Sequence, residues 1–134
     1  MVERRFPRDV ASLERIYGFI REFLAERGIG ADAAYDVDLI AEELFTNMVK
    51  YGRGGEPEIS IVLDWDASAL LFCIRDFGGE RFDPTLAPEA DTTRPIAERR
   101  AGGLGIHLVR RMADRLTYGY DGGNVIRVTK RLAV

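Results

Sequence analysis

The chain has 134 residues, of which 46% are hydrophobic and 31% charged, and its formal net charge is −3. This composition excludes a fibrous or largely disordered protein and predicts one globular domain over residues 1–134. The acidic balance disfavours direct binding to nucleic acid, the lack of an apolar run of roughly 20 residues disfavours a membrane span, and a single cysteine excludes an internal disulfide.

The chain opens with a predicted strand and a predicted helix. Residues 3–7 form a short strand that the proline ends. Asp9 or Ser12 then caps a helix, which is ended by Gly28 and Gly30. The apolar residues of this helix recur at helical spacing and are Val10, Leu13, Ile16, Ile20, Phe23 and Leu24.

The second predicted helix carries the most informative polar residues. Asp32 is its expected cap, and the glycines within residues 52–55 end it. At 100° per residue, Glu43, Asn47 and Tyr51 lie on one line along the helix, beside an arc that faces the core. A carboxylate and an amide at the edge of the core suit a proton acceptor beside a metal ligand, and the alternative is a solvated helix edge. The arc comprises Val37, Ile40, Ala41, Leu44, Phe45 and Met48.

Two strands and a long irregular stretch follow. Residues 59–65 alternate between apolar and polar side chains, as a half-buried strand does, and residues 66–68 form a turn. Residues 70–75 predict a more deeply buried strand, in which Cys73 is a small core residue. Residues 76–100 contain three prolines and several glycines, which is typical of a lid or binding loop.

The chain closes with a helix and a hairpin. Apolar spacing predicts a helix over residues 104–112, opened by glycines, and strands over residues 115–120 and 124–132 around a turn. The order β-α-α-β-β-lid-α-β-β predicts an α+β two-layer sandwich with the helices on one face of a mixed, mostly antiparallel sheet.

The stretch Asp76-Phe77-Gly78-Gly79 follows the buried strand directly. A carboxylate at a strand end, beside flexible glycines, is able to accept a hydrogen bond from a flat ligand such as a purine amino group. A plain Asp-Gly turn is the alternative. Phe82 begins the lid, and its aromatic ring is able to anchor the lid to the rest of the domain.

The third helix opens with Gly102, Gly103, Leu104 and Gly105. Glycines at a helix start let the backbone approach a phosphate, and the helix N-terminus supplies unpaired amides. The stretch is neither a Walker loop nor a dinucleotide fingerprint, because no Gly-Lys-Ser/Thr follows and no strand precedes it. His107, the single histidine, is expected to pack within this helix, and one histidine with one cysteine supports no zinc site.

These motifs follow one another in a characteristic order. Glu-x-x-x-Asn on a helix, Asp-x-Gly after a strand, a long lid and Gly-x-Gly into a helix make the chain resemble the GHKL-type (Bergerat) ATP-binding fold from end to end. Two features are similar to the anti-sigma factor serine/threonine kinases of bacterial partner-switching systems. They are the compact length and the absence of a histidine-bearing dimerisation helix from this sequence. The run Phe82-Asp83-Pro84 and the ending at residues 123–130 are also similar to that branch.

The resemblance implies roles for the motif residues. Glu43 is the expected catalytic base, and Asn47 is the expected ligand of the Mg²⁺ that bridges the ATP phosphates. Asp76 is expected to accept a hydrogen bond from the adenine amino group, and Gly78 to leave room for the ring. Further contacts to ATP are expected from Lys50, Tyr51, Phe82, Arg100, Gly102, Gly103, Leu104 and Gly105.

Some positions differ from the commoner pattern of that family. Tyr51 stands where the family often has histidine, and Asn124 stands where some relatives have threonine near the adenine. Arg99 and Arg100 are both candidates for a lid arginine, and Lys50 either reaches a phosphate or lies in solvent at the helix end.

The function that the resemblance implies is an ATP- and Mg²⁺-dependent protein serine/threonine kinase. Its expected substrate is a STAS-domain anti-anti-sigma factor, and its expected second partner is a sigma factor or a comparable regulator that it sequesters. One alternative is a nucleotide-gated binding switch of the same fold that transfers no phosphate. Another is the catalytic domain of a histidine kinase.

The expected assembly and location complete these predictions. The resemblance implies a homodimer, and Phe6, Ile16, Tyr17 and Phe19 are the expected places for an apolar contact surface. The N-terminus lacks the apolar core of a signal peptide, so the protein is expected in the cytoplasm, with neither a membrane nor nucleic acid as a partner.

Overall fold

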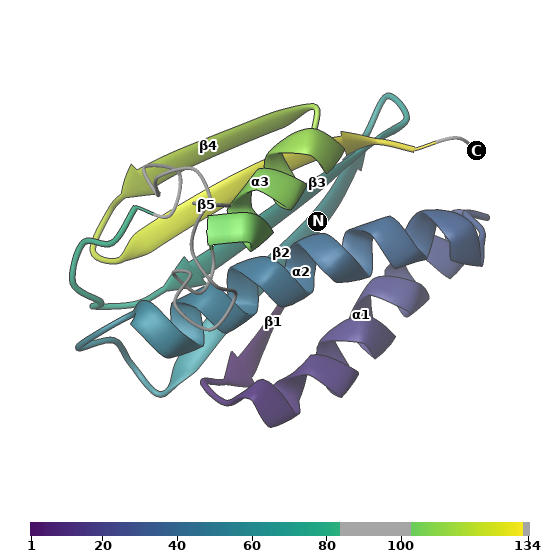
Figure 1. Cartoon of the computed structure of the whole chain (residues 1–134). Helices are drawn as coiled ribbons and strands as arrows, with labels where there is room; N and C mark the ends of the chain where they lie inside the picture. Colours follow the sequence, from purple (N-terminus) through teal and green to yellow (C-terminus); the bar gives the residue numbers. More distant parts are fainter. Residues whose placement is uncertain (84–102, 133–134) are drawn as a thin grey trace.

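One antiparallel sheet carries the α-helices on a single face in the computed structural model, which describes residues 1–83 and 103–132 (Figure 1). The two-layer α+β arrangement predicted from the order of elements is therefore confirmed. No helix in these two ranges is long and apolar enough to cross a bilayer. The elements are β1 (Val2–Pro7), a 3-10 turn (Val10–Ser12), α1 (Leu13–Ala25), α2 (Ala31–Tyr51), β2 (Glu58–Asp66), β3 (Ala69–Asp76), α3 (Gly103–Met112), β4 (Arg115–Tyr120) and β5 (Asn124–Arg131).

The strands run in the order β1-β2-β3-β5-β4. Each strand is antiparallel to its neighbours, so the prediction of a mixed sheet is wrong for the described strands. The last two strands form a hairpin, and its second strand, β5, inserts beside β3. This order places the start of β5 next to the end of β3, because Val125 lies opposite Arg75.

The starts of the first two helices differ in part from the expected caps. Asp9 caps the 3-10 turn by accepting a hydrogen bond from the Ala11 N–H at 2.9 Å. Ser12 instead donates its hydroxyl to the carbonyl of Pro7 at 2.8 Å. Asp32 is not the cap of α2, because Gly30 occupies that position and Asp32 lies in the first turn. A carboxylate there still interacts favourably with the helix dipole.

The core lies between α1, α2 and the helix-facing side of the sheet. The predicted apolar arc of α2 is confirmed, since each of its members is at most 4% exposed. Phe6, Ile16 and Phe19 are also buried in this core, at 2%, 0% and 2% exposure. The proposal of an apolar contact surface at these three residues is therefore wrong, because the chain's own helices and strands cover them.

The two faces of β3 have different environments. Leu70, Phe72 and Ile74 point to the helices and are buried, whereas Leu71 and Cys73 are half-buried. The prediction that Cys73 belongs to the core is wrong, because side chains alternate along a strand and Cys73 falls on the outer face. Partial burial nevertheless raises the pKa of its thiol.

Phe45→Ala tests the packing of α2 against the sheet. Phe45 is fully buried, so the substitution is expected to lower the free energy of unfolding by about 3–5 kcal/mol, measured by urea denaturation. The control is Tyr35→Ala on the same helix, where a 63% exposed ring predicts a change within about 0.5 kcal/mol. Equal losses in the two variants would contradict this packing.

Candidate functional site

The predicted polar line of α2 lies at the edge of the core. Asn47 is buried at 6% exposure, and Glu43, one turn earlier, is half-buried. Burial raises the pKa of the Glu43 carboxyl, the charge of Glu42 raises it further, and Lys50 opposes both effects. A carboxyl with a raised pKa is better matched to proton transfer near neutral pH than an ordinary glutamate.

The last turn of α2 carries the two other predicted residues of this helix. Lys50 is exposed, and its charge acts on the Glu43 carboxyl earlier on the same helix. Tyr51 is half-buried, and its ring centroid lies 5.9 Å from that of Phe82. Phe82, the predicted anchor of the lid, therefore packs against the end of the helix that carries Asn47.

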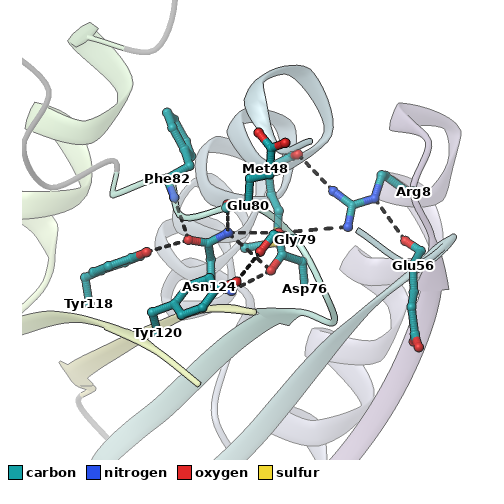
Figure 2. Close-up of polar contacts among 10 residues, drawn as sticks. All are labelled: Arg8, Met48, Glu56, Asp76, Gly79, Glu80, Phe82, Tyr118, Tyr120 and Asn124. Atoms are coloured by element: carbon teal, nitrogen blue, oxygen red, sulfur yellow. Dashed lines mark hydrogen bonds and ion pairs between the residues drawn. The ribbon is translucent and has the colours of Figure 1, made fainter. Parts of the chain in front are cut away.

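Asp76 ends β3 and is fully buried, with Asn124 of β5 as its main partner (Figure 2). The backbone N–H of Asn124 donates to Asp76 Oδ1 at 2.5 Å. The Asn124 side-chain amide donates to Oδ1 at 3.3 Å and to Oδ2 at 3.1 Å. These bonds provide the polar surroundings that a buried carboxylate requires.

Asn124 also holds the segment that follows Asp76. Its amide donates to the carbonyl of Glu80 at 2.7 Å, and its side-chain oxygen accepts from the N–H of Phe82 at 2.7 Å and from the hydroxyl of Tyr118. Figure 2 shows this side chain between Asp76 on one side and Phe82 and Tyr118 on the other. One buried amide thus connects the carboxylate to the backbone of the next turn.

Glycines allow the backbone to pass close to this carboxylate. A Cβ at Gly79 would lie 2.7 Å from Asp76 Cγ and 2.9 Å from its Oδ1, and a Cβ at Gly123 would overlap the Asp76 carbonyl. Gly78 has a φ of +73°, in the left-handed region that favours glycine, and its N–H donates to the carbonyl of Gly122 at 2.6 Å. The Asp-x-Gly motif therefore needs glycine for conformation at Gly78 and for space at Gly79.

Asn47 and Asp76 line the same small cavity, together with Phe82 and Asn124. The cavity measures about 10 Å³, which is close to the space needed for one water molecule. A purine enters this position only if a lining side chain moves. Of the lining residues, Phe82 is half-buried, whereas Asn124 is 1% exposed. The other lining residues are Leu44, Met48 and Ile126.

The remaining predicted residues lie at or before the start of α3. Gly103, Leu104 and Gly105 form its first turn, as predicted, and α3 packs against α2. In Figure 1 this first turn lies toward the C-terminal half of α2, the half that carries Asn47. Arg99, Arg100 and Gly102 lie outside the described residues, as does most of the predicted lid.

The structure adds residues that sequence reasoning missed. The hydroxyl of Tyr120 donates to the carbonyl of Gly79 at 2.7 Å, and the guanidinium of Arg8 lies 3.9 Å from Asp76 Oδ2. Both partners are more than 40 positions away in the chain, and no local pattern reveals such a contact. His107 is half-buried in α3, as expected, and its Nε2 has no hydrogen-bond partner within the described ranges.

The chain belongs to the histidine kinase-like ATPase domain family, whose model matches residues 6–130. Membership of an ATPase domain family implies ATP binding. The chain is also 29% identical over 109 residues to the serine-protein kinase RsbW of Halalkalibacterium halodurans, a match that covers 78% of this chain and 67% of the relative. The resemblance to the GHKL-type fold is therefore confirmed, with a distant relationship to this kinase.

Solved structures agree with this assignment of the fold. The RsbU and RsbW domains of a Mycobacterium tuberculosis protein match with a TM-score of 0.65 and 14% identity, over 98% of this chain and 32% of that one. The chain thus spans about a third of this two-domain structure. The blue-light activated histidine kinase of Erythrobacter litoralis matches with a TM-score of 0.52 and 17% identity, over 95% and 42% of the two chains. The histidine kinase AdeS of Acinetobacter baumannii matches with a TM-score of 0.53 and 13% identity, over 100% and 69%.

Gly79→Ala tests the close packing around Asp76. The added methyl group would overlap the carboxylate, so we expect a loss of about 1–3 kcal/mol in the free energy of unfolding, measured by urea denaturation. Gly18→Ala is the control, because Gly18 lies within α1 and a Cβ there meets nothing within 4 Å. That change is expected to stabilise the chain by about 0.5–1 kcal/mol. A neutral Gly79→Ala would contradict the described geometry.

Glu43→Gln tests the electrostatics of the predicted base. Burial raises the folded-state pKa of Glu43 above the unfolded value of about 4.3. The stability that this shift contributes is complete below the unfolded value and is lost as pH rises through the folded value. At pH 7 the variant is therefore expected to melt at a higher temperature than the wild type, and the difference should shrink toward about pH 4. Glu58→Gln, at an exposed carboxylate, is the control and should show no such trend. A Glu43→Gln difference that grows on acidification would reverse the assigned sign.

Proposed function

We propose that this chain is an ATP- and Mg²⁺-dependent protein serine/threonine kinase. The observation that carries the proposal is the shared cavity of Asn47 and Asp76, with the half-buried Glu43 one helical turn from Asn47. Nucleotide binding alone has no use for a carboxyl with a raised pKa at this place, whereas transfer to a hydroxyl does.

Each residue has a distinct part in the proposed reaction. Asp76 accepts a hydrogen bond from the adenine amino group, and Gly78 and Phe82 border the ring. Glu43 accepts the proton of the serine or threonine hydroxyl as its oxygen attacks the γ-phosphorus, and the bond to the β-γ bridging oxygen breaks, leaving ADP. Positioning and charge neutralisation supply most of the rate enhancement in such a transfer.

The residues present fit a bound Mg²⁺. No group of three or more potential metal-ligating His, Cys, Asp or Glu side chains occurs in the described part of the chain. Mg²⁺ in phosphoryl-transfer sites commonly uses one or two protein ligands together with waters and substrate phosphates, so it needs no such group. The Asn47 amide oxygen would hold the ion, which would neutralise charge on the phosphates. Lys50, Tyr51, Arg100 and the glycine-rich stretch Gly102–Gly105 are the proposed further contacts to ATP.

The proposed partners are those that the resemblance to the anti-sigma factor serine/threonine kinases implies, and the relative named a serine-protein kinase supports that branch. The substrate is a STAS-domain anti-anti-sigma factor, and the sequestered partner is a sigma factor or a comparable regulator. A second candidate function is a nucleotide-gated binding switch without transfer. The tyrosine at position 51 favours it, because the family often has histidine there.

Transfer of phosphate from labelled ATP with Mg²⁺ to the STAS-domain proteins encoded in the same genome tests the proposal. Acid-stable label on one of them is expected, and Glu43→Ala should reduce its rate by about 100-fold or more. Glu42→Ala is the matched control, because it removes the same charge from the preceding residue and should retain transfer.

Other outcomes separate the alternatives. ATP binding without label would support the binding switch, and acid-labile label would indicate a phosphohistidine product. Equal transfer by wild type and Glu43→Ala would contradict the role of Glu43. Protonation of Glu43 should slow the transfer as the pH is lowered. Because the pKa of Glu43 is raised, this loss of rate is expected at a higher pH than for an ordinary glutamate.

A further inference from the structure

Arg8 makes an unusual set of contacts for the first residue after a strand. Its Nε donates to the carbonyl of Glu56 at 3.1 Å, and its Nη1 donates to the carbonyl of Met48 at 3.2 Å. Its Nη2 lies 3.9 Å from Asp76 Oδ2. Figure 2 shows the guanidinium between these three partners, which come from the end of α2, the loop before β2 and the end of β3.

Two glycines leave space for this side chain. A Cβ at Gly52 would lie 2.9 Å from Nη1 of Arg8, and a Cβ at Gly55 would lie 3.0 Å from Cζ and overlap Nη2. The guanidinium therefore runs through a passage that any larger residue at these positions would fill. The glycines that end α2 thus also accommodate Arg8.

Arg8 brings a positive charge to within 3.9 Å of the buried Asp76 carboxylate. Asp76 is fully buried, and the Arg8 side chain is only 16% exposed, so solvent screens this pair weakly. Nη2 is buried and has no hydrogen-bond partner within the described ranges. Its nearest acidic atom is Oδ2 of Asp76, the oxygen that accepts the weaker share of the Asn124 bonds.

We propose that Arg8 is a positioning residue for adenine recognition. Its guanidinium bonds to the carbonyl of Met48, next to Asn47, and so fixes the end of α2 relative to Asp76. Its positive charge interacts favourably with the Asp76 carboxylate, which accepts the adenine amino group in the proposed function. Arginine suits this task because its planar guanidinium donates in several fixed directions at once. The inference rests on the proposed role of Asp76 and adds a second residue that acts through it.

The test compares Arg8→Met with Arg21→Met. Arg21 pairs with the largely buried Asp38 at 2.8 Å, so its loss also leaves a buried carboxylate without its cation, but at the α1–α2 contact. Affinity is measured by calorimetry for ATP and for purine riboside triphosphate, which lacks the amino group at position 6. Arg8→Met is expected to weaken ATP about tenfold or more and to bring the ratio of the two dissociation constants close to one. Arg21→Met should change neither by more than about twofold, although both variants lose thermal stability.

The outcomes distinguish the inference from the proposed function. No ATP binding by the wild type would overturn the proposed function and this inference with it. Binding by the wild type with the ratio unchanged in Arg8→Met would overturn the inference alone, because a purely structural role weakens both nucleotides equally. If Arg8→Met does not fold, Arg8→Lys carries the same test, since a lysine keeps the charge but cannot donate to both carbonyls and face the carboxylate.

Discussion

Burial of the Asp76 carboxylate is the constraint on which the candidate site depends. A carboxylate without solvent must be hydrogen-bonded and balanced by positive charge, because its transfer into the interior is otherwise strongly unfavourable. The backbone and side chain of Asn124 supply the hydrogen bonds, and the nearby guanidinium of Arg8 supplies the charge. The insertion of β5 beside β3 brings Asn124 to this position, so the strand order of the sheet is itself a requirement of the site.

Helix α2 serves the core and the site with the same turns. Its apolar arc packs against the sheet, and this packing holds the helix and its buried Asn47 side chain in place. Glu43 and Asn47 lie at the border of that arc, where Glu43 is half-buried and Asn47 is buried and lines the cavity. Partial burial of Glu43 is unfavourable for stability at neutral pH, because it raises the pKa of the Glu43 carboxyl.

The sequence predicts local periodicity and motif order well and long-range geometry poorly. The apolar arc of α2 and the closing hairpin were predictable, because each depends on spacing within one segment. The side of β3 on which Cys73 lies depends on register against β2 and β5, and the composition of one strand does not contain that register. In the sequence, Asn124 stood out only as a departure from a family pattern. Its bonds to Asp76 and Phe82 were not predictable without the strand order, which places β5 beside β3. Arg8 had no signal at all, since its partners lie 40 to 48 positions or more along the chain.

The arrangement around Asp76 also bears on the proposed binding of a base. Two carboxylate oxygens offer about four acceptor positions. Asn124 directs two N–H groups at them, because its backbone N–H donates to Oδ1 and one side-chain N–H is shared between Oδ1 and Oδ2, while the other side-chain N–H donates to Glu80. In the proposed function, the adenine amino group would use a remaining acceptor position of the carboxylate, and the small cavity would have to open to admit the ring. The Phe82 ring borders this cavity, and the hydrogen bond from the Phe82 backbone N–H to Asn124 does not involve the ring. The Asp76 carboxylate and the residues after Gly79 are thus linked through one buried amide, because Asn124 contacts both the carboxylate and the backbone of Phe82.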